Sequence, residues 1–541
     1  MYSGSRGGGT IPQSRTKVVG VLRGTLNATG APQVLFSPMR PSSSVLVFLA
    51  TLGCVPVALA QAVPGVTGGT GRDLSQLPGS FQTLHNDFNT VDKSGDRILT
   101  RSGCLAQFGD TFYWYGGNPR GFREQHCYAS KDLVHWAHKG VVLRHDTDAN
   151  RIDVLYNDTT KQYVMFLKYD GNGAHFAVAT ADNPEGPFMI KKVMLIDNAL
   201  IGDMSMFKDD DGSAYLCYVS WAKGTNRQHG IYKMSADYLT PEERVHLWDL
   251  GGREAPHLFK RNGTYYYGTS ETAWIDSSGT HYYTATNLAG PWTSARAMPT
   301  PGSDNSWDSQ CDFVFPIKGE QGTVYVYVGD RWLRDAPRGR NGSYVWLPME
   351  FDGDMPVLRY HQDWEINLRE GTWRAFDAAR NLAAGKSVIA SSEANGNVAT
   401  NVTSATNYTN YVAKHWDSDA SDPQWLSVDL GVATQVGRVI LKWNVAAAKT
   451  YQIQTSVDGS TWSDAFATDR GSANVVADVQ FSQRTARYIR VNGIERAPVQ
   501  VETRRRVPGD PAAATRPASN PTSRPSPPMR YSLFNVTVLA K

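Results

Sequence analysis

The stretch Arg261-Asn-Gly-Thr-Tyr-Tyr-Tyr267 decides the fold, because it is one copy of a pattern that recurs along the chain. In each copy a polar turn leads into a strand-like run rich in aromatic residues. The steps between the equivalent tyrosines are 50, 52, 51 and 59 residues, and these tyrosines are Tyr113, Tyr163, Tyr215, Tyr266 and Tyr325. Strands punctuated by turns at this period are typical of a β-propeller or a β-solenoid. Five copies over residues 80–375 predict an all-β protein with a five-bladed β-propeller.

A second pattern follows several copies of the first. Its members are Ser130–Trp136, Ala181–Phe188 and Thr286–Trp292. Each is rich in turn residues, so we interpret it as the turn before the outer strand of a unit. In such a ring the first strand of every unit lies next to the central axis, and the ends of those strands converge on one face.

The composition changes after Trp373, where an Ala-rich joint leads into a second region of short alternating strands. Examples are Gln424–Gly431 and Arg487–Gly493. This pattern predicts a β-sandwich over residues 376–541. Residues 501–529 are rich in Pro, Ser, Ala and Arg and predict a disordered insertion, or non-coding sequence kept in the gene model.

The N-terminal region predicts export. An apolar run, Ser44–Ala60, ends in an A-x-A cleavage pattern, and Met39 would be a normal start for such a signal. We therefore expect residues 1–60 to be an upstream extension and signal peptide, residues 61–79 to be a linker, and the mature protein to be secreted and free of the membrane. Six possible N-glycosylation sites agree with secretion: Asn157, Asn262, Asn341, Asn401, Asn407 and Asn535.

The charge balance argues against a nucleic-acid or polyanion partner. The chain has 54 Lys and Arg against 51 Asp and Glu, a net charge of +3. Its 15 Trp, 25 Tyr and 19 Phe suit β cores and the stacking of rings on sugars. A monomer that acts on a polysaccharide or oligosaccharide is expected. Without Cys54 four cysteines remain, which allow three disulfide pairings that the sequence does not rank.

Polar groups recur in the propeller region where apolar strand residues would be expected. Glu254 is the one titratable carboxyl group of the turn Gly251–His257, and partial burial would raise its pKa into the range of a proton donor. Three further stretches contain such groups: Ile201–Lys208 with Asp203, Trp307–Phe313 with Asp308 and Gln310, and Gly329–Trp332 with Asp330 and Arg331. Structural roles, such as pairing with an arginine or capping a turn, remain the alternative for each aspartate.

These stretches resemble glycoside hydrolase family 43, and most of all its exo-β-1,3-galactanase group. The matching residues are Asp203–Gly212, Arg253–Pro256, Asp308–Gln310, Gly329–Trp332 and Tyr344–Asp354. The resemblance implies a five-bladed propeller with inverting chemistry. It implies that Glu254 is the general acid and that Asp203 tunes and orients it. The galactanase group lacks the usual aspartate base, and Gln310 is our candidate for the residue that positions the water.

The residues themselves leave the base open. An inverting glycosidase needs an acid on one side of the bond and an activated water on the other, with the two groups roughly 6.5–9.5 Å apart. Asp87, Asp92 and Asp308 are alternative bases, although Asp92 reads more simply as a turn residue. The substrate-binding residues that we expect are Asn150, Asp153, Arg253, Asp308, Asp330, Arg331 and Trp332.

Two departures from the galactanase pattern lie in the expected sugar pocket. Ile98–Cys104 stands where the group shows an Ala-His-Gly-Gly-like segment, and Asn150 stands where it has a substrate-binding glutamate. β-Xylosides and α-L-arabinofuranosides therefore remain alternative substrates. A non-catalytic carbohydrate-binding propeller is the alternative to an enzyme.

The C-terminal region resembles a coagulation-factor type C, discoidin-like jelly roll, the fold of family 32 carbohydrate-binding modules. The residues that carry the resemblance are Gln424–Gly431, Ser456–Trp462 and Arg487–Val491. Lys414–Asp417 stands where such modules often have a calcium site, but its residues match that site poorly. No cofactor is expected for the chemistry, and no metal-ligand spacing is present.

Overall fold

The structure is a computed structural model, and it describes residues 73–117, 123–169, 174–221, 228–273, 277–331, 344–404, 414–497 and 530–540. The predicted signal region, most of the predicted linker and the predicted insertion at 501–529 lie outside the described residues, as do the possible glycosylation sites Asn341 and Asn407.

Within these ranges, five antiparallel sheets follow one another along the chain. The first contains β2 (Arg101–Phe108), β3 (Thr111–Gly117), β4 (Glu124–Ser130) and β5 (Ala137–Arg144). The second contains β6 (Ala149–Asn157), β7 (Gln162–Tyr169), β8 (His175–Ala181) and β9 (Met189–Met194). The third contains β10 (Ile201–Lys208), β11 (Ala214–Ser220), β12 (Gln228–Met234) and β13 (Pro241–Asp249). The fourth contains β14 (Arg253–Arg261), β15 (Thr264–Glu271), β16 (Thr280–Ala285) and β17 (Arg296–Ala297), and the fifth contains β18 (Gln310–Lys318), β19 (Thr323–Asp330) and β20 (Tyr344–Pro348).

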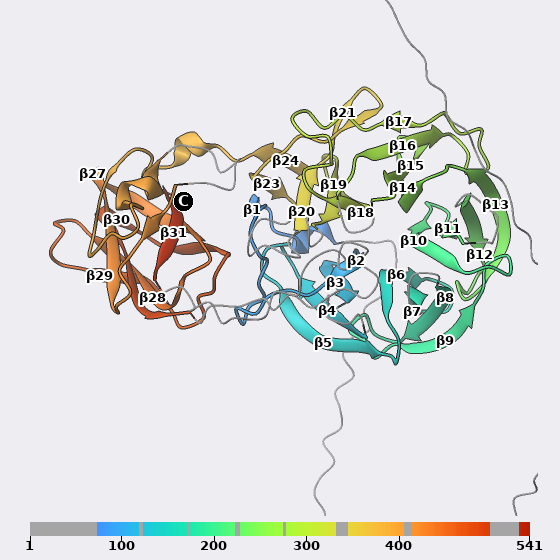
Figure 1. Cartoon of the computed structure of the whole chain (residues 1–541), viewed down its shortest axis with the longest axis horizontal. Helices are drawn as coiled ribbons and strands as arrows, with labels where there is room; N and C mark the ends of the chain where they lie inside the picture. The colour runs from blue at the N-terminus through green and yellow to red at the C-terminus, as the bar shows by residue number, and fades with distance from the viewer. Residues whose placement is uncertain are drawn as a thin grey trace, which may run out of the picture. The chain divides into compact units, whose positions relative to one another are not determined.

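The first strands of these sheets surround a common centre, which gives a propeller-type arrangement (Figure 1). β2, β6, β10, β14 and β18 contact one another in turn, and β18 contacts β2, so that the ring closes. A further sheet joins the two ends of this region and contains β1 (Gln82–His85), β23 (Asp363–Asn367) and β24 (Thr372–Ala375). The strands β21 (Glu350–Asp352) and β22 (Met355–Val357) form a hairpin, and a short 3-10 helix, η1 (Leu74–Gln76), precedes β1.

The aromatic repeat corresponds to the second strand of each sheet. Tyr113, Tyr163, Tyr215, Tyr266 and Tyr325 lie on β3, β7, β11, β15 and β19. Their side chains pack in the cores between neighbouring sheets, where Tyr266, for example, has no exposed surface. The second sequence pattern is also confirmed, because each of its stretches joins the third strand of a sheet to the fourth.

Every first strand is interrupted by a register shift close to its N-terminal end. The shifts follow Arg101 in β2, Asn150 in β6, Ile201 in β10, Glu254 in β14 and Cys311 in β18. A β-bulge bends a strand and redirects the side chains around it. The five strands therefore present their bulged ends to the same face of the ring.

The C-terminal region is built on one hydrogen-bonded sheet around its own core. Its two long strands, β27 (Gln424–Trp443) and β30 (Val476–Arg496), pair along most of their length, with register shifts that bend them. The other elements are β25 (Ser387–Ala390), β26 (Trp416–Asp417), β28 (Ala448–Ser456), β29 (Ser463–Thr468), β31 (Ser532–Leu539) and the 3-10 helices η2 (Ala378–Arg380) and η3 (Ala399–Thr403). Buried residues such as Trp443 and Val536 fill the core.

Burial decides several features that the sequence left open. Cys104, Cys127, Cys217 and Cys311 are all buried and free. The side chains of Asn157 and Asn535, two of the six possible glycosylation sites, are buried in the folded protein. The described residues include no helix that is long and apolar enough to span a membrane.

Candidate active site

Glu254 lies at the bulged end of β14. The register shift follows it directly, and the next residue, Ala255, has a left-handed φ of 51°. The side chain of Glu254 is partly exposed. Its Oε1 accepts a hydrogen bond of 3.0 Å from Nε2 of Gln310, the first residue of β18. The carboxyl group is therefore held by the neighbouring sheet while it stays open to the face of the ring.

Asp203 lies in the bulge of β10 between two cations. Its Oδ2 accepts a 2.9 Å hydrogen bond from Nη2 of Arg151, and its Oδ1 accepts a 3.1 Å bond from Nζ of Lys168. Oδ2 also accepts a 3.2 Å bond from the backbone N–H of Ala255. Asp203 therefore fixes the backbone directly after Glu254 as well as contributing a charge.

The pKa values of the two carboxyl groups are displaced in opposite directions. Burial, followed by the negative charge of Asp203, raises the pKa of Glu254 from 4.5 to about 7. Burial alone would raise the pKa of Asp203, but the charges of Arg151 and Lys168 outweigh it and hold that pKa below its usual range. At neutral pH one carboxylate is ionised beside a carboxyl group that can still donate a proton, which is the arrangement that a general acid needs.

Gln310 connects the acid to the cations. Besides its bond to Glu254, its Nε2 donates to Oγ of Ser270 at 3.0 Å, and its Oε1 accepts a 2.8 Å bond from Nη2 of Arg151. The side chain is 1% exposed. In this structure the amide therefore contacts the acid and its neighbours.

A second buried carboxyl pair lies behind this cluster. Nη1 of Arg151 donates to Oδ1 of Asp312 at 2.6 Å. Burial and then the charge of Asp330 raise the pKa of Asp312. Burial also raises the pKa of Asp330, whose Oδ2 accepts from the backbone N–H of Ser102.

The structure brings together the three predicted catalytic residues, but it distributes the predicted substrate-binding residues more widely. Asp153 is buried, its Oδ2 accepts from the backbone N–H of Met206 at 2.7 Å, and burial raises its pKa to about 7. Arg253 donates to Nδ1 of His281 at 2.6 Å and lies 3.5 Å from Glu271. These are contacts to protein groups around the cluster.

The remaining predicted binding residues differ in burial and hydrogen bonding. Asn150 lies at the bulge of β6, and its Oδ1 is buried with no hydrogen-bond partner among the described residues. Asp330 and Arg331 are each 1% exposed, which places both below the surface of the ring. Trp332 lies outside the described residues.

The three alternative bases, Asp87, Asp92 and Asp308, make different contacts with the protein. Asp87 forms a buried ion pair with Nη1 of Arg331. Asp92 accepts from the backbone N–H groups of Ser94 and Asp96, so its reading as a turn residue is confirmed. Oδ1 of Asp308 accepts a 2.9 Å bond from Nδ2 of Asn305.

Sequence reasoning missed Arg151, Lys168, Asp312 and Ser270 as members of the cluster. Arg151 has the largest part in it, because one buried guanidinium contacts Asp203, Gln310 and Asp312. A usable signal was present: Arg151 occupies the bulge of β6 as Asp203 occupies the bulge of β10. Aligning the repeats on these strand ends would have singled it out.

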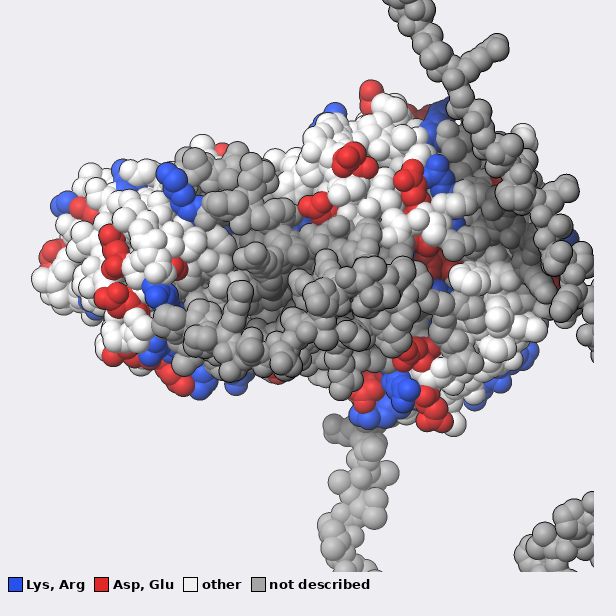
Figure 2. Space-filling view, in the orientation of Figure 1, with Lys and Arg blue, Asp and Glu red and all other residues white. Residues whose placement is uncertain are grey.

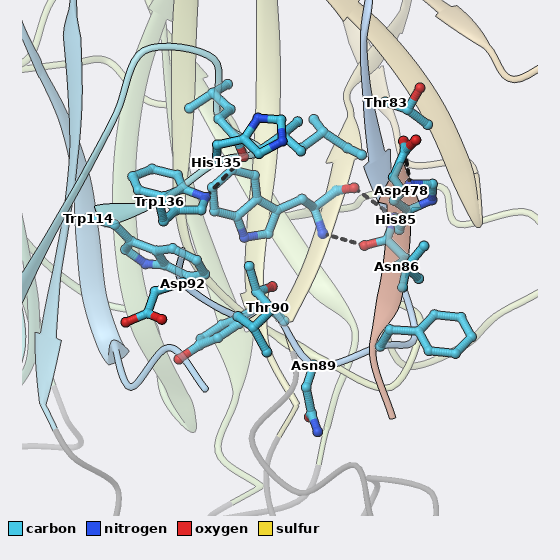
Figure 3. A pocket seen from close by; sticks show the side chains of 18 of the residues that line it. Thr83, His85, Asn86, Asn89, Thr90, Asp92, Trp114, His135, Trp136 and Asp478 are labelled. Carbon is cyan, nitrogen blue, oxygen red and sulfur yellow. Dashed lines mark hydrogen bonds and ion pairs between the residues drawn. The ribbon is translucent and has the colours of Figure 1, made fainter. Parts of the chain in front are cut away.

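A separate cavity of about 210 Å³ lies away from this cluster (Figure 3). Trp114, Trp136, His85 and Asp478 are among its lining residues, and none of the residues of the catalytic cluster lines it. On the described surface that Figure 2 shows, acidic and basic side chains are interspersed. No group of three or more potential metal ligands is present in the described parts of the chain.

Near the position of the suspected calcium site, the side chain of Asp417 is engaged by protein groups. It accepts from Nδ2 of Asn395 at 3.1 Å and of Asn397 at 2.9 Å, and lies 3.3 Å from Nε2 of His415. These residues do not fit a calcium cage, which requires six to eight oxygen ligands.

Two parts of the chain match the models of known families. The model of the glycosyl hydrolases family 43 matches residues 104–353, and that of the NedA-like galactose-binding domain matches residues 395–491. The β-D-galactofuranosidase xynD of Aspergillus niger is 31% identical over 192 residues, which are 33% of this chain and 54% of that protein. A xylosidase/arabinosidase 43B of Humicola insolens is 26% identical over 34% of this chain and 36% of its own length. The chain thus matches about half or less of the length of these curated relatives.

Two solved structures have the same architecture. An exo-β-1,3-galactanase from Clostridium thermocellum is 29% identical, with a TM-score of 0.51 over 57% of this chain and 73% of its own. An exo-β-1,3-galactanase from Phanerochaete chrysosporium, solved with β-1,3-galactotriose, is 22% identical, with a TM-score of 0.51 over 84% of this chain and 100% of its own, a likeness of fold alone. The chain thus contains a glycosyl hydrolases family 43 domain at residues 104–353 and a C-terminal NedA-like, coagulation-factor type C galactose-binding domain at residues 395–491.

Proposed function

We propose that this protein is a secreted, exo-acting hydrolase of β-1,3-linked galactan that inverts the anomeric configuration, and that each of the five sheets is one blade of a five-bladed propeller. The observation that carries the proposal is the pairing of Glu254 with Asp203. A partly exposed carboxyl group with a pKa of about 7 lies next to an ionised carboxylate that also holds its backbone. A structural carboxylate at a strand end needs no such arrangement.

In the proposed mechanism Glu254 donates its proton to the glycosidic oxygen as the bond breaks. Burial, and then the negative charge of Asp203, raise the pKa of Glu254 so that it can keep its proton near neutral pH. Arg151 and Lys168 keep Asp203 ionised. A water molecule attacks from the opposite side of the sugar, as inversion requires. We assign the positioning of this water to Gln310. Its Nε2 lies 3.0 Å from Oε1 of Glu254, closer than the roughly 6.5–9.5 Å that separates the two groups of an inverting site, so the assignment requires the Gln310 side chain to leave Glu254 when substrate enters.

The choice of β-1,3-galactan is supported by the likeness to the Clostridium thermocellum exo-β-1,3-galactanase. The NedA-like galactose-binding match supports a role for the C-terminal domain in holding the polysaccharide. A second candidate, hydrolysis of β-D-galactofuranosides, is favoured by the 31% identity to the Aspergillus niger enzyme.

The test is a substrate panel: β-1,3-galactobiose, arabinogalactan, and the aryl glycosides of β-D-galactofuranose, β-D-xylose and α-L-arabinofuranose. We expect galactose from the first two, released initially as the α-anomer by NMR, and no turnover by Glu254→Gln. Turnover of a furanoside or xyloside alone would keep the acid and replace the substrate. If no compound is hydrolysed while sugars still bind, the protein is a carbohydrate-binding propeller.

A further inference from the structure

Trp221 is the most exposed tryptophan among the described residues, with 45% of its surface accessible. Other tryptophans of the ring, such as Trp114 and Trp136, are almost completely buried. A single exposed apolar side chain is ordinary on a protein surface. The position of Trp221 is what gives it meaning.

Trp221 lies opposite Leu200, next to the bulge that contains Asp203. It follows the last residue of β11, Ser220, which pairs with Ile201 of β10. Its backbone N–H donates to the carbonyl oxygen of Leu200 at 2.9 Å. The register of the two strands then shifts, and Gly202 and Asp203 occupy the irregular segment. The indole is therefore anchored at the same end of the sheet as the catalytic carboxylates.

Gly202 holds the indole close to this strand. A Cβ atom added to Gly202 would lie 2.4 Å from Nε1 and 2.9 Å from Cδ1 of Trp221, which is closer than real Cβ atoms approach. Glycine at this position thus lets the ring edge rest against the backbone beside Asp203. Backbone contact restricts the ring before any ligand arrives, so less freedom is lost on binding.

We propose that Trp221 is the platform for the sugar ring on the leaving-group side of the cleaved bond. This inference rests on the proposed function. An exo-acting enzyme holds the terminal sugar at the axis, where Glu254 and Asp203 lie on first strands. Trp221 directly follows the second strand, β11, which lies one strand farther from the axis, and we place the next ring of the chain there. An aromatic face suits the apolar C–H face of a neutral hexopyranose.

The test measures sugar binding without hydrolysis, by calorimetry in the Glu254→Gln protein. Galactose occupies the terminal-sugar position alone, whereas β-1,3-galactobiose also reaches the leaving-group position. Adding Trp221→Ala should weaken galactobiose binding about tenfold, the scale of one aromatic contact, and leave galactose binding unchanged. Trp221→Phe keeps an aromatic face and should lose less than about threefold, which makes it the matched control.

The outcomes separate the two claims. If Trp221→Ala leaves galactobiose binding unchanged, or weakens both sugars equally, the inference about Trp221 is overturned and the proposed function stands. If the Glu254→Gln protein binds neither sugar, the galactan assignment is overturned. The inference that Trp221 holds the second sugar of galactan is then overturned as well.

Discussion

Replacing Asp203 by asparagine should move the alkaline limb of the pH profile of kcat/KM to lower pH. Glu254 must be protonated to act as the acid, so activity falls as pH rises through its pKa in the free enzyme, about 7. The difference between 4.5 and about 7 corresponds to about 3.4 kcal/mol at 1.36 kcal/mol per pKa unit. Burial supplies the largest part, and the charge of Asp203 is next.

An adjacent like charge is worth about one pKa unit or more, roughly 1.4 kcal/mol. Removing the charge of Asp203 also leaves the positive charge of Arg151 less balanced, and that charge lowers the pKa of Glu254 further. We therefore expect the limb to move from about 7 to about 6 or below.

The assay is galactose release from β-1,3-galactobiose between pH 4 and 9, at substrate concentrations well below KM. Asp92→Asn is the matched control, because that carboxylate belongs to a turn and lies outside the cluster, and its profile should equal that of the parent protein. A limb that stays in place or moves to higher pH in Asp203→Asn would refute the electrostatic coupling. It would leave Asp203 with an orienting role alone, through its bond to the N–H of Ala255.

Three further predictions concern the surroundings of Gln310, Gly103 and the buried cysteines. Gln310→Met should lower kcat and move the alkaline limb to higher pH, because the Gln310 hydrogen bond lowers the pKa of Glu254; a limb at lower pH would contradict this. Gly103→Ala should reduce the free energy of unfolding, measured in urea, by about 2 kcal/mol or more, because its Cβ would lie 1.8 Å from the carbonyl oxygen of Tyr115. Gly322→Ala is the control and should cost less than about 0.5 kcal/mol, because its Cβ has no neighbour closer than 3.3 Å. In a Cys54→Ser protein, an Ellman-type reagent should label no thiol until the protein is unfolded and then four, because Cys104, Cys127, Cys217 and Cys311 are free and buried; fewer than four would indicate disulfides.

The repeat allowed the order of the strands to be predicted from local sequence. An aromatic strand after a polar turn, recurring about every 50 residues, needs only local hydrogen bonding and alternation to be recognised. The tyrosines on β3, β7, β11, β15 and β19 lie where that pattern puts them. Glu254, Asp203 and Gln310 could be singled out for a similar reason, since polar side chains at strand ends contradict the apolar pattern around them.

The partners of those side chains were decided by tertiary structure. Arg151 contacts Asp203 from 52 residues away and Gln310 from 159 residues away, separations that no local pattern encodes. Arg253 stands next to Glu254 in the sequence, yet its partners are His281 and Glu271.

The sequence by itself therefore determined the repeat and the family motifs, and it singled out Glu254 as the candidate acid. Ring closure, burial and the bulge at each first strand decided which charges face one another, and hence which carboxyl group keeps its proton. The physical reason is that a pKa depends on solvent exclusion and on charges a few ångströms away, and both are properties of the assembled ring.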